Sequence, residues 1–180
     1  EVYSNTGGQA SKATPMGAVA QFSSSGKQSA KKDLGAMFLP YGNIYIAQVN
    51  MGASPAQLMT ALREASAYRG PSLVIAYAPC TAHGIRAGMA RVQEEMKRAT
   101  ASGYWPLYRR HPERTPSFML DSAAPSLDYE EFLKGEVRYE ALGRTFPERA
   151  ESLARAAREK AQERFRLYAA LAQMGAEKEK

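Results

Sequence analysis

The sequence predicts an α/β fold in which helices flank a mainly parallel sheet. Two stretches, 44–49 and 73–78, are near-continuous apolar runs of strand length, as expected for parallel strands covered on both faces. The segment between them begins with Ser54-Pro55 and ends at Gly70-Pro71. Its apolar positions at helical spacing are Leu58, Leu62 and Ala65. Strand, helix and strand with short connections form a right-handed crossover unit, which indicates a parallel pair.

The first 39 residues predict little regular structure. Residues 1–3 include β-branched and aromatic side chains and are typical of the end of a strand. Residues 10–32 are rich in Ser, Ala, Gly and Lys, and we expect an ordered loop there with one helical turn at 17–22. Asp33 can then cap a short helix that runs through Leu39.

The second half alternates helices with two short strands. The spacing predicts a helix over 86–101, strands at 104–109 and 118–121, a short helix at 129–133 and one long helix over 147–174. The long helix carries an apolar stripe of Leu153, Ala157, Ala161, Phe165, Tyr168 and Leu171. We expect this helix to lie on the domain surface or against a neighbouring subunit.

Composition and length are those of one domain of a longer chain. The 180 residues are 44% apolar and 23% charged, and no run approaches the roughly 18 apolar residues of a membrane span. The chain starts without Met and shows no basic and apolar leader. We therefore expect a cytoplasmic fragment, cut inside a domain, with no membrane partner.

The net charge of +6 is spread evenly along the chain. Residues 1–80 and 81–180 each carry three more basic than acidic residues, so no concentrated basic arm favours nucleic acid. The lysines of the first part also lack interleaved aromatic residues for base stacking. The charge is compatible with a mild attraction for acidic partners.

Most common catalytic and metal motifs are missing from the sequence. Gly26-Lys27 is not a phosphate-binding P-loop, because Gln21 and Gln28 occupy positions where that motif needs Gly and Ser or Thr. CxxC and HExxH spacings are absent, and the adjacent pairs of glutamates point apart on their helices. His83 and His111 are the two histidines, and nothing in their setting assigns them a role.

One polar stretch follows the first expected strand. Ser4, Asn5, Thr6, Gly7 and Gly8 are placed where open parallel sheets bind ligands, beyond the carboxyl end of a strand. The same residue types also make ordinary surface turns, so composition alone leaves both interpretations open.

Longer strings decide between them through a family resemblance. EVYSNTGGQASKATP, continued by GAVAQF and GKQSAKKDLG, resembles the thiamine-diphosphate-binding domain of the pyruvate:ferredoxin (flavodoxin) oxidoreductases. The similarity extends through Asn50-Met-Gly52, the stretch 72–80 and GYWPLY at 103–108. It implies the C-terminal part of that domain at 1–139, followed by a helical extension at 140–180.

The resemblance also implies a set of site residues. Glu1, Val2, Tyr3, Ser4 and Asn5 match the element that binds thiamine diphosphate. Within it, the backbone carbonyl of Val2 would complete a magnesium shell, and the amide of Asn5 would orient the substrate during catalysis. The remaining magnesium ligands would lie upstream of this sequence.

Cys80 is the only cysteine in the chain. Taken alone, a single Cys after an apolar strand is more often a small buried hydrophobe than a ligand. Its Ala-Pro-Cys setting matches the family position that supplies the fourth thiolate to the [4Fe-4S] cluster nearest the thiamine. Four thiolates is the ordinary ligation of such a cluster, so the other three would come from upstream domains of the same polypeptide.

The resemblance implies a full activity and its partners. Pyruvate would be decarboxylated oxidatively, its acetyl group passed to coenzyme A, and electrons sent through iron-sulfur clusters to ferredoxin or flavodoxin in a homodimeric enzyme. Two other classes stay open at this point: a non-oxidative thiamine-diphosphate enzyme, which needs no thiolate, and a basic non-enzymatic binding module.

Overall fold

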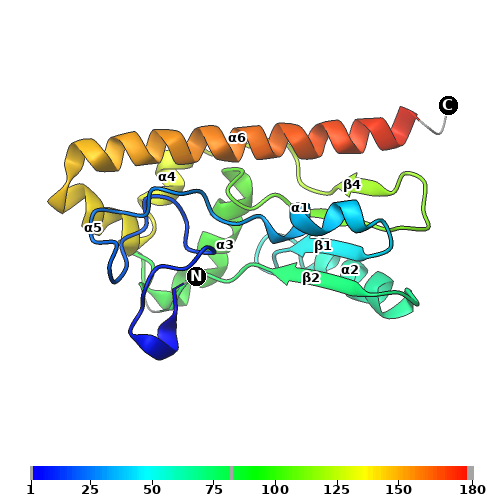
Figure 1. Cartoon of the computed structure of the whole chain (residues 1–180), viewed down its shortest axis with the longest axis horizontal. Helices are drawn as coiled ribbons and strands as arrows, with labels where there is room; N and C mark the ends of the chain where they lie inside the picture. Colours follow the sequence, from blue (N-terminus) through cyan, green and yellow to red (C-terminus); the bar gives the residue numbers. More distant parts are fainter. Residues whose placement is uncertain (1, 82, 178–180) are drawn as a thin grey trace.

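The computed structural model describes residues 2–81 and 83–177. The α-helices are α1 (Leu34–Phe38), α2 (Pro55–Ala67), α3 (Val92–Ala101), α4 (Tyr129–Leu133), α5 (Val137–Thr145) and α6 (Pro147–Glu177). The strands are β1 (Tyr45–Val49), β2 (Ser72–Ala76), β3 (Tyr108–Arg110) and β4 (Phe118–Leu120). Short 3-10 helices are η1 (Ser4–Thr6), η2 (Leu39–Tyr41) and η3 (Met89–Arg91). Figure 1 shows α6 lying along the whole length of the molecule.

The four strands form one mixed sheet in the order β2-β1-β3-β4. β1 and β2 are parallel, with Tyr45 opposite Ser72 and Val49 opposite Ala76, which confirms the predicted crossover unit. β3 is antiparallel to both β1 and β4. The predicted α/β fold is therefore confirmed, but the sheet is mixed where the sequence predicted a mainly parallel one. A short connection joins β3 to β4, and such a connection permits only an antiparallel pair.

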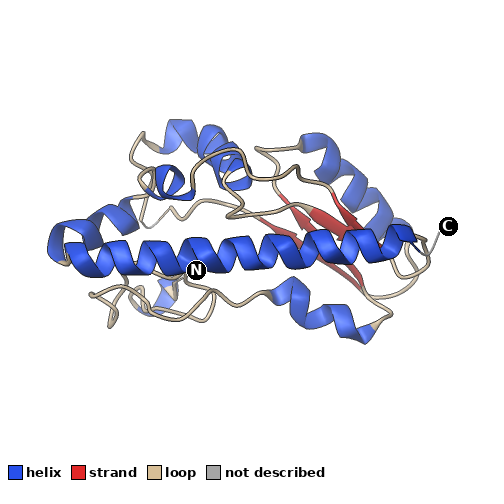
Figure 2. Cartoon of the chain, turned by 90° about the horizontal axis from the view of Figure 1, so that it is seen from above, coloured by secondary structure: helices blue, strands red, loops and turns tan. Residues whose placement is uncertain are grey.

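Helices cover both faces of this sheet (Figure 2). On one face, Ala61 of α2 packs with Tyr45, Ala47 and Val49 of β1. On the other face, Ile46, Tyr108 and Phe118 pack with Tyr168 of α6. All five residues of β1 are buried, because it lies inside the sheet with a helix on each side.

Capping side chains start the short helices where the sequence predicted them. The Asp33 carboxylate accepts the amide of Ala36 at 3.1 Å, and the Ser54 hydroxyl accepts the amide of Gln57 at 3.2 Å. Asp128 accepts two amides at the start of α4. The predicted bounds of α1, α2 and α4 therefore match the structure closely.

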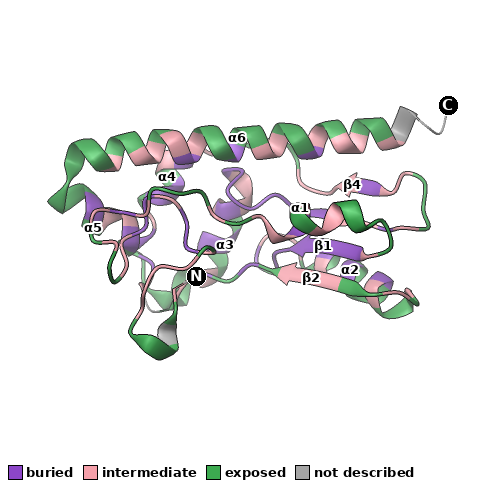
Figure 3. Cartoon of the chain, viewed as in Figure 1, coloured by how far each residue is buried: buried purple, intermediate pink, exposed green. Residues whose placement is uncertain are grey.

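The predicted apolar stripe of α6 faces the rest of the molecule (Figure 3). Ala157, Ala161 and Tyr168 are buried, whereas Glu151 and Glu159 are exposed. No helix in the described part of the chain combines the length and apolar character needed to cross a membrane.

Two predicted elements near the N-terminus are wrong. Tyr3 joins no sheet strand; its amide donates to the carbonyl of Gln9, so the segment folds into a local turn. The expected helical turn at 17–22 is also absent, because Gly17 and Phe22 both have positive φ angles, which a right-handed helix excludes. Phe22, instead of packing, is 93% exposed.

Two boundaries in the second half are shifted. α3 begins at Val92 and not at 86, because Gly88 has a φ of +85° that interrupts a helix. β3 begins at Tyr108 and not at 104, because Pro106 has no amide to give to a ladder. The segment before it stays buried, and the carbonyl of Pro106 accepts a bond from the Gln48 side chain at 2.7 Å.

Lysine side chains within the long N-terminal loop bond to its own carbonyls, which the sequence did not predict. The ammonium group of Lys27 donates to the carbonyl of Thr14 at 2.6 Å, and that of Lys31 donates to the carbonyl of Ala13 at 2.8 Å. Gly26 lies against Leu142 of α5, where a Cβ atom would come within 2.8 Å of that side chain. The loop is therefore held by hydrogen bonds within itself and by packing against α5.

Candidate functional site

Cys80 lies four residues beyond the carboxyl end of β2, where the chain has left the sheet. The amide of Tyr77 still bonds to the carbonyl of Val49 at 3.0 Å, but the residues described between Ala78 and Gly88 form no strand or helix. The Cys80 thiol is half-buried, and its Sγ atom lies 3.1 Å from Nδ1 of His83. The structure thus places next to the predicted thiolate ligand a histidine to which the sequence assigned no role.

The other ring nitrogen of His83 contacts the N-terminal loop. Its Nε2 atom lies 3.0 Å from the carbonyl oxygen of Val19, a residue 64 positions away in the sequence. A carbonyl can only accept a hydrogen bond, so Nε2 is the donor in this contact. In the structure, Nδ1 is then free to accept from the thiol of Cys80.

Backbone hydrogen bonds hold the turn that follows Cys80. The amide of Gly84 donates to the carbonyl of Cys80 at 2.9 Å and closes the turn. Further on, the amide of Arg86 donates to the carbonyl of Gly135 at 2.7 Å, and Ile85 forms a bridge with Glu136. The segment before α5 is therefore the anchor for the Cys80 turn.

A group of buried charged residues lies beside this anchor. Arg138 is 1% exposed and pairs with Glu136, which is 2% exposed and accepts a bond from the Tyr77 hydroxyl at 3.1 Å. Glu95 on α3 is also buried. Burial, followed by the negative charge of Glu136, raises the pKa of Glu95 to about 7, although Nε of Arg98 lies 3.3 Å from its carboxylate.

The predicted thiamine-binding residues lie in an exposed N-terminal turn. Val2 is half-buried, Tyr3 is 55% exposed, and Asn5 is exposed within η1. The amide of Gly8 donates to the carbonyl of Tyr3 at 2.8 Å, so the turn closes on itself. Ser4 belongs to η1 by its backbone, and Glu1 lies outside the described residues.

The N-terminal turn and Cys80 are connected indirectly, through contacts of the N-terminal loop. Within the described residues no hydrogen bond joins Asn5 to Cys80. Gln9 forms bridges with Tyr3 and with Gln21, and two residues before Gln21 the carbonyl of Val19 reaches His83. Residues 2–81 and 83–177 contain no cluster of three His, Cys, Asp or Glu side chains that could hold a metal ion.

At the end of β1, Asn50 has a structural role. Its side chain is fully buried and donates to the carbonyl of Met96 at 2.7 Å, while its oxygen accepts the amide of Gly52 at 3.1 Å. Gly52 leaves no room for a side chain, since an added Cβ would come within 2.5 Å of Met96. The Asn50-Met-Gly52 string therefore closes the turn after β1 and docks it on α3.

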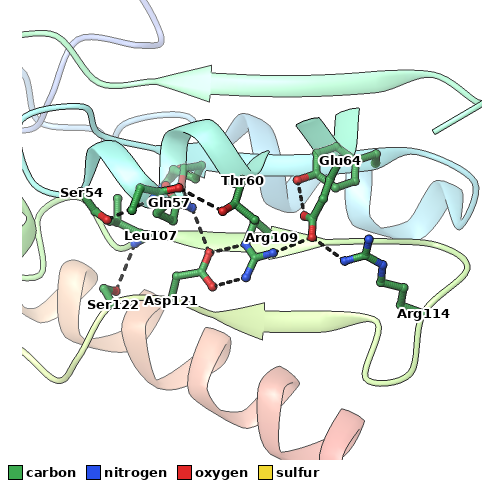
Figure 4. Close-up of polar contacts among 12 residues, drawn as sticks. Ser54, Gln57, Thr60, Glu64, Leu107, Arg109, Arg114, Asp121 and Ser122 are labelled. Atoms are coloured by element: carbon green, nitrogen blue, oxygen red, sulfur yellow. Dashed lines mark hydrogen bonds and ion pairs between the residues drawn. The ribbon is translucent and has the colours of Figure 1, made fainter. Parts of the chain in front are cut away.

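A second polar network ties α2 to the sheet (Figure 4). Arg109 on β3 bonds to both oxygens of Asp121 and, at 2.8 Å, to Glu64 on α2. Glu64 also accepts from the Tyr45 hydroxyl at 2.9 Å and pairs with Arg114. Burial alone would raise the pKa of Glu64, but these donors outweigh it and leave the pKa lowered. The network is structural and touches none of the predicted site residues.

Sequence reasoning missed both polar groups. On the helix at 55–67 it expected Leu58, Leu62 and Ala65 to form the inward face, yet the inward positions of α2 include Gln57 and Glu64, while Leu62 is 45% exposed. Gln57 and Glu64 are seven residues apart, a spacing of two helical turns, which was the available signal. The signal for His83 was its distance of three residues from the single cysteine.

Comparison with known proteins agrees with the resemblance seen in the sequence. No protein-family profile matches the chain. It is 53% identical over 177 residues to a pyruvate-flavodoxin oxidoreductase of Klebsiella pneumoniae and 52% identical over 177 residues to a pyruvate:ferredoxin oxidoreductase of Moorella thermoacetica. In both cases the match covers 96% of this chain and 15% of the relative. A mitochondrial pyruvate dehydrogenase [NADP(+)] of Euglena gracilis is 48% identical over 157 residues, which are 85% of this chain and 9% of that protein.

The structure is an α/β domain with a mixed sheet, and the relatives that its sequence matches are oxidoreductases. More closely, the chain is homologous to one segment of the pyruvate:ferredoxin (flavodoxin) oxidoreductases, and it spans about 15% of the length of the relatives that it matches.

Proposed function

We propose that this chain forms part of an enzyme that oxidatively decarboxylates pyruvate to acetyl-CoA and CO2. The observation that carries the proposal is the match to enzymes of this name at 53% and 52% identity over 96% of the chain. The carboxyl carbon leaves as CO2, the acetyl group joins the sulfur of coenzyme A, and the thiol proton goes to solvent. Two electrons leave one at a time for ferredoxin or flavodoxin.

The cofactors in this proposal are thiamine diphosphate, Mg2+ and [4Fe-4S] clusters. When bound, thiamine diphosphate stabilises the carbanion left by decarboxylation and a cluster accepts single electrons. The N-terminal turn is compatible with its proposed part, because Asn5 is exposed. We propose that Asn5 orients the substrate and that Val2 gives its carbonyl to magnesium, within a cofactor element formed by residues 1–5.

The setting of Cys80 fits one thiolate of a split iron-sulfur site. Its sulfur is half-buried on a turn held by backbone bonds, and its described contact is to a histidine ring and not to an apolar core. Because a cubane cluster takes four thiolates and this chain has a single cysteine, three would come from elsewhere in the polypeptide. We propose Cys80 as that fourth ligand.

The rest of the proposal concerns the whole protein. The chain would act within a longer cytoplasmic polypeptide that assembles as a homodimer and uses coenzyme A. Residues 1–139 would belong to the thiamine-diphosphate-binding domain and residues 140–180 to a helical extension, although the boundary falls within α5.

The replacement Cys80→Ser in the full-length enzyme tests the proposal. Serine exchanges a soft thiolate for a weak, hard ligand, so that the cluster becomes labile or absent. We expect iron content to fall by about one cluster per chain and ferredoxin reduction to slow strongly, while thiamine diphosphate still binds. Ala78→Ser, at an exposed position two residues away, is the matched control. Unchanged iron content and unchanged ferredoxin reduction in Cys80→Ser would refute the role.

A further inference from the structure

His83 joins the turn that carries Cys80 to the long N-terminal loop. Its two ring nitrogens contact two different segments: Nδ1 lies 3.1 Å from the sulfur of Cys80, and Nε2 lies 3.0 Å from the carbonyl oxygen of Val19. The ring is half-buried, so the protein shields it partly from water. His83 is the residue whose side chain bridges the two segments.

Val19 is itself fastened to the anchor of the Cys80 turn. Its amide donates to the carbonyl of Arg138 at 3.4 Å, and the amide of Val137 donates to the carbonyl of Gly84 at 3.4 Å. Three segments therefore contact one another in pairs. His83 joins the Cys80 turn to the loop, Val19 joins the loop to α5, and Val137 joins α5 to the turn. The His83 contact joins the loop to the turn directly, and at 3.0 Å it is shorter than either of these two 3.4 Å bonds.

The described residues between Ala78 and Gly88, which exclude residue 82, form no strand or helix. The Cys80 turn therefore depends on the backbone bonds of Gly84 and Arg86 and on the contact of His83 with Val19. A metal-ligating side chain must be held within a few tenths of an ångström of its working position, and this precision comes from supporting contacts. A thiolate on a less firmly held turn would release its iron more readily.

We propose that His83 is a positioning residue that holds the Cys80 turn against the N-terminal loop through its bond to the Val19 carbonyl. This inference rests on the proposed role of Cys80 as a cluster ligand. It adds that the loop at 10–32 supports the metal site from a distance, although no residue of that loop ligates.

Three replacements of His83 in the full-length enzyme separate its two contacts. Gln places an amide nitrogen as many bonds from Cβ as Nε2 is, and so keeps a donor for Val19. Asn places its polar atoms where Nδ1 lies, and so loses Val19. Ala loses both contacts. Thr81→Ala, exposed and on the same turn, is the matched control.

Two readouts are measured: the rate at which a chelator removes iron, and hydrogen exchange at the amides of 17–19. We expect Asn and Ala to lose iron faster than wild type and to exchange about fivefold faster at the Val19 amide, the effect of roughly one hydrogen bond of about 1 kcal/mol. His83→Gln should retain wild-type behaviour in both readouts, as should Thr81→Ala.

The inference is refuted if His83→Gln behaves as His83→Ala does, or if all three variants keep the wild-type rates. Cys80→Ser separates that failure from failure of the proposed function. If Cys80→Ser loses its cluster while the His83 variants are unaffected, only the positioning role of His83 is excluded. If Cys80→Ser keeps its full iron content, the role of Cys80 as a cluster ligand is excluded as well.

Discussion

The replacement Glu95→Gln should change how the stability of this chain depends on pH. Glu95 is 6% exposed and its pKa is raised to about 7, chiefly by burial. Between pH 4.5, the usual pKa of the carboxyl group, and pH 7, the folded state still holds the proton of Glu95, whereas the unfolded state has already released it. Wild-type stability should therefore fall as pH rises between about 4.5 and 7, and level off above that.

The size of the effect follows from the shift. Each unit of pKa difference corresponds to about 1.4 kcal/mol, so ionised Glu95 costs the folded state roughly 3 kcal/mol at pH 8.5. Gln carries no charge and removes this cost, less whatever its contact to Arg98 contributes. We expect Glu95→Gln to be more stable than wild type at pH 8.5 and to lose most of this advantage at pH 5.

Urea unfolding at the two pH values measures this difference. Trp105 is the single tryptophan and is 7% exposed, so its fluorescence reports loss of the core. Glu64 does not contribute over this range, because its lowered pKa confines its effect to pH values below about 4.5. Glu148→Gln, at an exposed position on α6, is the control. Equal pH dependence in wild type and Glu95→Gln would refute the reasoning.

Two further predictions concern the α2 network and the N-terminal turn. Arg109→Leu should lower the free energy of unfolding by about 3–5 kcal/mol, because it leaves Glu64 and Asp121 without the largely buried cation that they share. Arg114 is half-exposed, so Arg114→Leu should cost below about 1 kcal/mol. Urea unfolding compares the two variants, and equal losses would contradict the assignment. Asn5→Ala in the full-length enzyme should lower kcat roughly a hundredfold, about 3 kcal/mol, with thiamine diphosphate and magnesium binding nearly intact; wild-type turnover would exclude the orienting role.

The sequence predicted best those elements whose signals are local. The helix over 55–67 has a capping serine and a first-turn proline, and the long helix has an apolar stripe that continues for five turns. These signals depend on neighbours in the sequence and survive in the fold. The crossover strands were found because burial on both faces demands an apolar run.

Elements formed by distant contacts were missed or misplaced. α5 was not predicted, because its buried residues include Arg138, and a charged side chain at an inward position breaks the apolar pattern by which a helix is recognised. The N-terminal loop takes its shape from lysine bonds to its own carbonyls and from His83, none of which leaves a periodic signal. For the candidate site, the resemblance supplied Asn5 and Cys80, but the partner of Cys80 required the structure.

α6 also fixes the distance between two separate hydrophobic clusters of the interior. At 31 residues it is about 46 Å long, and its N-terminal half buries Ala157 and Ala161 in one hydrophobic cluster while Tyr168 enters another. One residue inserted between these halves would turn everything beyond it by about 100° and advance it by about 1.5 Å, so Tyr168 would swing away from Tyr108 and Phe118. The spacing along this helix is therefore fixed by geometry, even at positions where the side chain itself meets only water.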